Sequence, residues 1–276
     1  MTKWISILLL FASSTMWGQT VASITTATTP LDLGYRQMYN LDFAAAHKTF
    51  QGWKQSHPED PMGPVSNAAA YLFSEFDRLH VLEVDLFTDN QRFEKREKPV
   101  PDANVRAAFD GELSQTERLA SDVLARSPQD ANAMFAQVLA NGLRGDYLSL
   151  IEKRNLAGLS YMKTGRGLAE KLLAAHPGYY DAYLAVGVEN YILGITAAPV
   201  RWLLRLSGAQ TDKEEGISKL RLTAEKGHYL APFARLLLAV AALRDNDRGT
   251  AKSILASLSQ EFPSNQLYQK ELARIQ

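Results

Sequence analysis

The 276-residue sequence contains no cysteine. Disulfides, thiolate catalysis, cysteine-ligated zinc and lipidation of an N-terminal cysteine are therefore all excluded. A hydrophobic content of 46% is ample for a packed core and argues against wholesale disorder. If the chain is exported, its core alone must stabilise it.

The sequence also lacks an excess of charge of either sign. Thirty basic and thirty acidic side chains give a formal net charge of zero. Nucleic-acid binding needs clustered Lys and Arg that displace counterions, so a strongly basic binder of this kind is not predicted. We expect no nucleic-acid partner.

Catalytic signatures are missing as well. The sequence has no HExxH, Walker-type loop, G-x-S-x-G elbow or EF-hand loop. The segment "GRGLAE" at 165–170 lacks the last glycine of a nucleotide-binding loop and follows no strand. We therefore predict a protein that is not an enzyme and that has no cofactor.

The N-terminus has the pattern of a secretory signal peptide. Lys3 supplies a positive charge, Trp4 to Phe11 form an apolar run too short to span a bilayer, and small and polar residues follow. We predict a signal peptide over 1–22, with cleavage after Gly18 or Ala22, and an exported protein, periplasmic or secreted. A retained N-terminal anchor is the alternative. Residues 23–30 read as a flexible lead-in to a single domain over 31–276.

Beyond the lead-in there is no strand-like alternation, and apolar residues recur at helical spacing between short Pro, Gly, Asn or Asp turns. The pattern predicts helices over 31–39, 42–56, 64–81, 83–96, 103–126, 130–143, 147–175, 180–194, 198–206, 212–226, 230–244, 247–261 and 264–274. Asp146 is expected to cap the long helix 147–175. The fold class is therefore all-α.

An internal repeat links two of these helix–turn–helix units. Placing Pro128 over Pro177 gives an offset of 49 residues, at which many side chains coincide. The coinciding pairs are Leu119 with Leu168, Ala120 with Ala169, Ala125 with Ala174, Ala133 with Ala182, Ala136 with Ala185, Asn141 with Asn190, and Gly145 with Gly194.

A third copy lies at 40–60, and a weaker fourth at 245–265. In the third, Phe43, Ala46, Phe50 and Trp53 lie on one helix face, and Pro58 begins the next unit after a tight turn. The fourth copy has Ala251, Leu255, Leu258 and Pro263 at similar spacing.

This spacing resembles the second helix of a tetratricopeptide repeat (TPR). The stretch from Asp181 to Gly187 resembles that family's first helix, with Tyr183 as the large aromatic and Gly187 as the small residue that admits the partner helix. The sequence departs from the family at Trp53, where alanine is usual, so looser packing is expected there. The unit lengths are irregular, which indicates degenerate repeats with longer helices and insertions.

The resemblance implies a TPR-like, right-handed superhelical solenoid of antiparallel helix pairs. It also implies non-catalytic binding of a protein or peptide, here in the cell envelope, along a concave face lined by the first helix of each pair. The partner-binding residues that it nominates are Asp181, Leu184, Ala185, Val188, Glu189, Tyr191 and Ile192, with Asn132, Phe135 and Ala136 in the preceding copy. The identity of the partner and the oligomeric state are not predicted.

A separate candidate is the segment "APVRWLLRLSG" at 198–208, where Arg201, Trp202 and Arg205 form a basic, aromatic face. Three readings stay open: a core-packed connector, a contact for an acidic partner, and a helix on a membrane surface. A peripheral membrane protein is thus one alternative function. A small-ligand-binding or hydrolytic protein with a pocket in the solenoid bend is another.

The histidines predict no metal site. His57 and His176 each precede the turn proline of a repeat, which favours a structural role. Asp77, His80 and Glu83 lie on adjacent turns of a predicted helix and have a spacing that can hold a metal, but no second set accompanies them. We predict no metal.

Glu189 and Asn190 stand side by side in an apolar stretch. Asn190 recurs at Asn141, which favours a role in the repeat architecture, whereas Glu189 has only Ala140 opposite it. Glu189 is therefore the residue that the sequence nominates for function.

Overall fold

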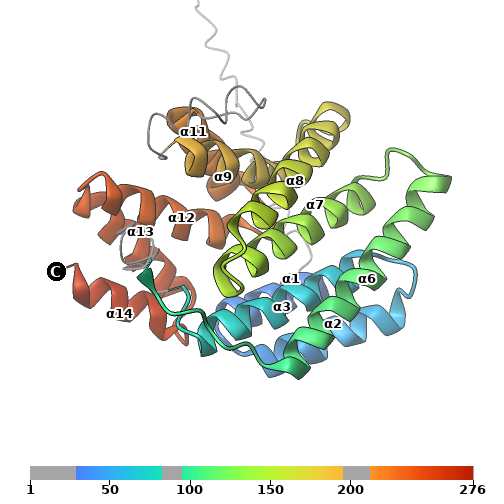
Figure 1. The fold of residues 1–276 in the computed structure, drawn as a ribbon, viewed down its shortest axis with the longest axis horizontal. Coiled ribbons are helices and arrows are strands. Elements are labelled where there is room, and N and C mark those ends of the chain that lie inside the picture. The colour runs from blue at the N-terminus through green and yellow to red at the C-terminus, as the bar shows by residue number, and fades with distance from the viewer. Residues whose placement is uncertain (1–28, 83–94, 195–211, 276) are drawn as a thin grey trace, which may run out of the picture.

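A computed structural model describes residues 29–82, 95–194 and 212–275, and all regular structure in these ranges is helical. The α-helices are α1 (Pro30–Tyr39), α2 (Phe43–Ser56), α3 (Met62–Arg78), α6 (Ala103–Arg126), α7 (Ala131–Asp146), α8 (Asn155–Ala175), α9 (Tyr183–Gly194), α11 (Lys213–Lys226), α12 (Ala231–Arg244), α13 (Arg248–Glu261) and α14 (Gln266–Arg274). Each packs against the next in chain order, as a stack of helical hairpins requires (Figure 1). The predicted all-α solenoid is confirmed.

The repeat is visible in the backbone of four turns. The residues before the turn prolines are His57, Ser127, His176 and Phe262, with φ between −138° and −124° and ψ between 67° and 82°. Proline disfavours the helical conformation in the residue before it, so the helix must end there. In each turn the amide three residues later donates to the carbonyl of that same residue. The four copies read from the sequence therefore share one turn structure.

The first helix pair follows the expected pattern. Ala46 and Phe50 are fully buried, while Phe43 and Trp53 are partly buried against the same core. The Trp53 ring stacks on His57 with centroids 3.8 Å apart, and its Nε1 donates to Asp60 at 2.8 Å. The tryptophan is thus held by polar and stacking contacts with its own repeat turn.

Close approach of α9 and α11 depends on two glycines. A Cβ on Gly187 would lie 3.0 Å from the carbonyl oxygen of Gly216, and a Cβ on Gly216 would lie 2.5 Å from the amide nitrogen of Tyr191. Backbone atoms at these distances leave no space for a side chain. The expectation that Gly187 admits the partner helix is confirmed.

The prediction of one long helix over 147–175 is wrong. Residues 147–151 form a π-helix at the end of α7, Lys153 adopts a left-handed conformation with φ 57°, and α8 begins at Asn155. Asp146 is the last residue of α7, and its side chain makes no capping hydrogen bond. Every residue from 146 to 155 is compatible with a helix, so the break comes from tertiary contacts. Arg96 donates to the carbonyl oxygens of residues 149 and 150, which the broken helix leaves free.

Helix α3 is also shorter than predicted. It ends at Arg78, and His80 has a φ of 54° beyond the helix end. Asp77 and His80 therefore do not share a helix face. Glu83 lies outside the described residues, as do the signal peptide, most of the predicted helix 83–96 and all of the predicted helix 198–206. Among the described residues no group of three or more potential ligands is placed to hold a metal ion.

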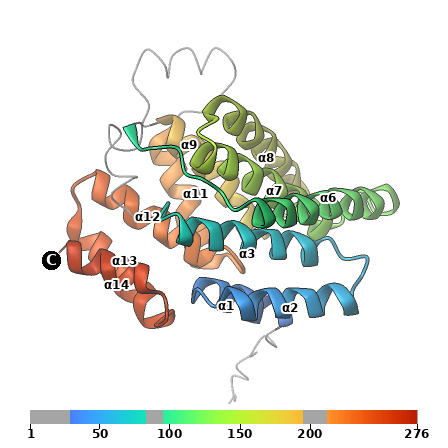
Figure 2. The same ribbon diagram turned by 60° about the horizontal axis from the view of Figure 1, so that its bottom comes forward.

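The two ends of the helical stack meet. The ring of Tyr35 on α1 stacks on Tyr229 with centroids 4.7 Å apart, and Tyr39 donates from its hydroxyl to the Tyr229 carbonyl at 3.1 Å. Asn265, which caps α14, donates to the carbonyl of Tyr39 at 2.8 Å. Figure 2 shows α1 beneath α3, with α13 and α14 beside it. Repeats of an open solenoid contact only their neighbours, so the stack here is closed by its first helix.

Candidate functional site

The three residues nominated on α7 are engaged by the fold. Phe135 and Ala136 are fully buried, and the Phe135 ring packs 4.8 Å from that of Tyr179. Asn132 is held by the Tyr179 hydroxyl, which donates to its Oδ1 at 3.1 Å. Phe135 and Ala136 contribute packing between consecutive repeats rather than contact surface.

Asp181 caps the start of α12. Only 3% of it is exposed, and its carboxylate accepts hydrogen bonds from the amides of His228, Tyr229 and Leu230 at 2.8 to 3.1 Å. Burial raises the pKa of Asp181, and these three amides partly offset that effect. This carboxylate therefore has a structural role. It fixes the backbone at the start of α12, although it lies 47 to 49 residues earlier in the sequence.

Glu189 and Asn190 are both buried, with 1% and 0% of their surface exposed. Glu189 Oε2 lies 3.0 Å from Arg166 Nε on α8, but the two groups are not aligned as a hydrogen bond. Burial raises the pKa of Glu189, and Arg166 partly offsets the rise. An ion pair removed from water in this way contributes little net stability, because desolvation offsets the attraction. The repeat pattern does not account for an acidic residue at position 189. The ion pair of Glu189 with Arg166 in the neighbouring helix accounts for it.

Leu184, Ala185 and Val188 on α9 are partly exposed, whereas Tyr191 is buried. The side chain of Ile192 and the separate candidates Arg201, Trp202 and Arg205 lie outside the described residues, so their roles stay predictions.

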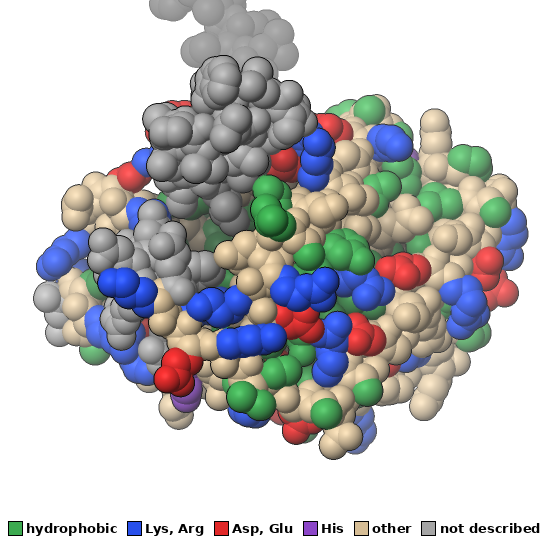
Figure 3. Space-filling view, in the orientation of Figure 1, with side chains coloured by type: hydrophobic (Ala, Val, Ile, Leu, Met, Phe, Trp, Pro, Cys, Tyr) green, Lys and Arg blue, Asp and Glu red, His purple; other side chains and the backbone are tan. Residues whose placement is uncertain are grey.

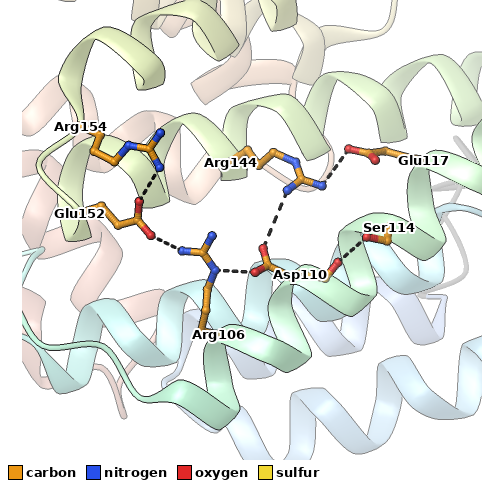
Figure 4. A network of polar contacts seen from close by, with 7 residues as sticks. All are labelled: Arg106, Asp110, Ser114, Glu117, Arg144, Glu152 and Arg154. Carbon is orange, nitrogen blue, oxygen red and sulfur yellow. Dashed lines mark hydrogen bonds and ion pairs between the residues drawn. The ribbon is translucent and has the colours of Figure 1, made fainter.

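Charged residues that the sequence did not single out form a chain of ion pairs between α6, α7 and the turn before α8 (Figure 4). Arg106 contacts Asp110 and Glu152, both at 2.5 Å, and its guanidinium lies 4.1 Å above the Tyr147 ring. The chain alternates in sign along Arg154, Glu152, Arg106, Asp110, Arg144 and Glu117. The three cations of this ion-pair network balance its three anions, so the network has no net charge. It holds the π-helix against α6.

A second buried network joins α2, α3 and α6. Lys54 Nζ donates to both oxygens of Glu112 at 2.7 Å, and Asn67 Nδ2 donates to Glu112 Oε1 at 2.8 Å. The Oδ1 of Asn67 therefore faces His47 Nδ1 at 2.7 Å, which places the proton on that nitrogen. Each polar group of this network has a partner inside the fold, so it ties three helices together.

The surface seen in Figure 3 mixes Lys and Arg with Asp and Glu across its middle, and its hydrophobic side chains occur in small groups. A shallow hollow at the turn edge lies between the first two repeat turns and is lined by His57, Pro58, Glu59, Asp60, Pro61, Val123, Asp130 and Asn132.

Asp146 differs from these engaged carboxylates. It lies about 100° around the helix from both Gly145, which faces α8, and Tyr147, whose ring stacks on Phe109 of α6. Arg144, which pairs with α6, lies on roughly the opposite side. Asp146 thus points away from the sides of α7 that meet α6 and α8; α3 also packs against α7.

The same side of α7 carries Leu139 and Leu143, at seven and three residues before Asp146. With the 49-residue offset, Leu139 corresponds to Val188 and Phe135 to Leu184 on α9. We call Leu139, Asp146, Leu184 and Val188 the inner row. Leu139 is 8% exposed, and the other three are partly exposed.

No described residue donates a hydrogen bond to the Asp146 carboxylate or pairs with it. Burial raises its pKa from 3.8 to about 7. The adjoining π-helix is a form that occurs frequently at functional sites. The only signal of this site in the sequence is an Asp in an apolar row, which also fits a helix cap.

Comparison with known proteins assigns neither a family nor a function. No family model matches the chain, and no curated protein matches it. A solved structure of a thermophilic TPR protein from Thermus thermophilus is similar, with 16% identity, 89% of this chain and 96% of that chain covered, and a TM-score of 0.45. At that score the similarity carries no argument about function, and the fold rests on the helices themselves. Within the described ranges, no helix has the length and apolar content needed to cross a membrane.

Proposed function

We propose that this protein is a non-catalytic scaffold that binds a segment of another protein along the inner row. The observation that carries the proposal lies on α9, where the apolar side chains of Leu184, Ala185 and Val188 are partly exposed, whereas their counterparts on α7 are buried. A stack of helical hairpins suits an extended partner, because one segment can contact successive units.

The charged networks favour a scaffold over an enzyme. In the part of the chain that the structure describes, the carboxylates around Arg106 and the Glu112 network are occupied by partners within the fold. A hydrolytic site would need such groups to converge on a shared space with free valences. The small-ligand alternative therefore has no specific observation in its favour, and the membrane alternative depends on 198–208.

A display experiment tests the proposal. Random peptides of about twelve residues are selected on the immobilised full chain, and the selected peptides are measured against Val188→Asp in the inner row. The control is Ser121→Asp on the exposed side of α6. We expect Val188→Asp to weaken binding about tenfold or more, because it places a charge against apolar side chains, and Ser121→Asp to leave it unchanged. Peptides that bind both variants as tightly as the parent would refute the inner row as the binding surface.

We also propose that the protein is exported to the cell envelope, on the basis of the pattern at 1–22. The intact mass of protein recovered from the periplasm or medium of expressing cells tests this. A mass that starts after Gly18 or Ala22 is expected. Full-length protein retained in the cytoplasm would contradict it.

A further inference from the structure

The contact that closes the helical stack includes an ion pair between His228 and Asp32. His228 lies in the turn between α11 and α12, and its Nε2 is 2.5 Å from Asp32 Oδ1 on α1. The same carboxylate completes the capping box of α1, because its Oδ2 accepts hydrogen bonds from the amide and the hydroxyl of Thr29. Asp32 therefore joins the start of the first helix to a turn near the other end of the stack.

Side chains, rather than closely packed backbones, hold α1 to the C-terminal helices. In the described structure α1 packs most closely against α2 and α3, and no comparably close pair joins it to α12, α13 or α14. An interface made in this way can separate while the helices on both sides of it stay intact. Besides the ion pair, its contacts are the stack of Tyr35 on Tyr229, the packing of Tyr39 on Phe262, and the hydrogen bonds of Tyr39 with the Tyr229 carbonyl and Asn265.

The charge of His228 responds to pH. About half of its side chain is exposed, so the imidazole exchanges protons directly with solvent. Histidine is the side chain whose charge ordinarily changes between about pH 5 and pH 8. The Tyr229 ring lies edge-on to the imidazole, with centroids 4.4 Å apart, and leaves the ion pair with Asp32 in place. The closure thus contains a charge that is present in mild acid and absent in mild base.

The charged groups that face His228 favour its cationic form. Asp32 faces it from α1, and Asp181 faces it from the 3₁₀ turn before α9, where its carboxylate accepts from the His228 amide at 2.9 Å. Burial raises the pKa of Asp181, and the cationic imidazole is among the groups that offset the rise. Lys226, at the end of α11, has its ammonium over the Tyr180 ring at 5.2 Å. His228 is therefore held between carboxylates of two other elements.

We propose that His228 and Asp32 form a proton-dependent latch on the closed stack. In mild acid the imidazolium pairs with the carboxylate and holds α1 to the start of α12. As the pH rises above about 7, His228 loses its proton, the attraction between the charges is lost, and the end formed by α12, α13 and α14 separates from α1 more often. An exposed ion pair changes such an equilibrium by about two- to fivefold, so the latch adjusts the closure that the aromatic contacts provide. This regulation goes beyond the proposed function and does not depend on it.

The absence of cysteine makes a distance measurement direct, because introduced thiols are the only ones to label. Lys48 on α2 and Lys252 on α13 are exposed, and Lys48→Cys with Lys252→Cys places a nitroxide on each side of the closure. Double electron–electron resonance on the full chain then gives the fractions of closed and open molecules. We expect the open fraction to be about two- to fivefold larger at about pH 8.5 than at about pH 5.5.

Two substitutions of His228 separate its charge from its shape. His228→Gln is uncharged and should give the larger open fraction at both pH values. His228→Lys keeps a cation at both and should stay as closed at about pH 8.5 as the parent is at about pH 5.5. The matched control is His57→Gln, which removes an exposed histidine from another repeat turn and should behave like the parent.

Three results would overturn the latch. The first is a parent chain whose open fraction does not change with pH. The second is a pH dependence that persists in His228→Gln, because it would come from a group that every variant retains, such as Asp181. The third is a loss of helical circular dichroism at about pH 8.5, since separation of the two ends leaves the helices folded.

Discussion

Replacing Asp146 with Asn should stabilise the protein above neutral pH and leave its stability unchanged in acid. In the folded chain burial raises the Asp146 pKa from 3.8 to about 7. Between these values the folded state binds the proton more tightly than the unfolded chain does. The free energy of unfolding therefore falls as the pH rises from about 4 to about 7, and the penalty is fully present above pH 7.

The magnitude follows from the size of the shift. About three pKa units correspond to about 4 kcal/mol at 1.36 kcal/mol per unit. Asp146 is partly exposed, so solvent screening reduces the effective penalty to about 2 kcal/mol. For a chain of this size, that corresponds to a rise in the melting temperature of roughly 4 to 8 °C for Asp146→Asn at about pH 8.

Thermal unfolding followed by circular dichroism from about pH 4.5 to pH 8.5 measures this effect. The informative quantity is the difference between variant and parent at each pH, because the other carboxylates titrate in both. Asp122→Asn, on the exposed side of α6, should give a flat difference close to zero. A flat difference for Asp146→Asn, or one that grows toward low pH, would refute the assignment of a buried, unpartnered carboxylate.

Two further predictions concern the packing and the capping that form the site. Gly216→Ala should lower the free energy of unfolding by about 2 kcal/mol or more, because its Cβ would meet the Tyr191 amide nitrogen at 2.5 Å. Gly167→Ala on α8, where no atom lies within 4 Å, should instead stabilise by up to about 1 kcal/mol; equal effects in urea unfolding would contradict the close approach of α9 and α11. Asp181→Asn should cost about 1 to 3 kcal/mol, since an amide cannot accept from three backbone amides as the carboxylate does. Asp42→Asn, at an ordinary N-cap, should cost close to nothing, and a similar cost for both would refute the bridging role of Asp181.

Local signals in the sequence were sufficient for the helices and for the repeat. Proline at 58, 128, 177 and 263 ends the preceding helix through its own steric bulk, so the four turns could be placed from the sequence. Helix 103–126 has the predicted bounds, because Asp102 caps its start and Ser127 precedes a proline. Gly187 could be assigned to a close helix contact because only a missing Cβ allows one.

The candidate site was less predictable. The sequence placed Phe135, Ala136 and Glu189 on a binding face, but helical periodicity does not tell which side of a helix faces a neighbour and which faces solvent. Asp146 was expected to cap a helix, since an Asp before an apolar run is a normal start signal. Its environment became visible only when α6 and α8 were placed on two sides of α7.

Residues close together in the chain are enough to specify helical hairpins, because apolar side chains at helical spacing and prolines at repeat turns act over a few residues. Contacts between residues distant in the sequence determine the break between α7 and α8, where Arg96 donates to carbonyls more than fifty residues away. Such contacts also close the helical stack, through Tyr35, Tyr39 and Tyr229. Such contacts also set which carboxylates have partners. Pairing depends on side chains distant in sequence, so Glu189 meets Arg166 across α8 and α9, while Asp146 has no hydrogen-bond or ion-pair partner among the described residues.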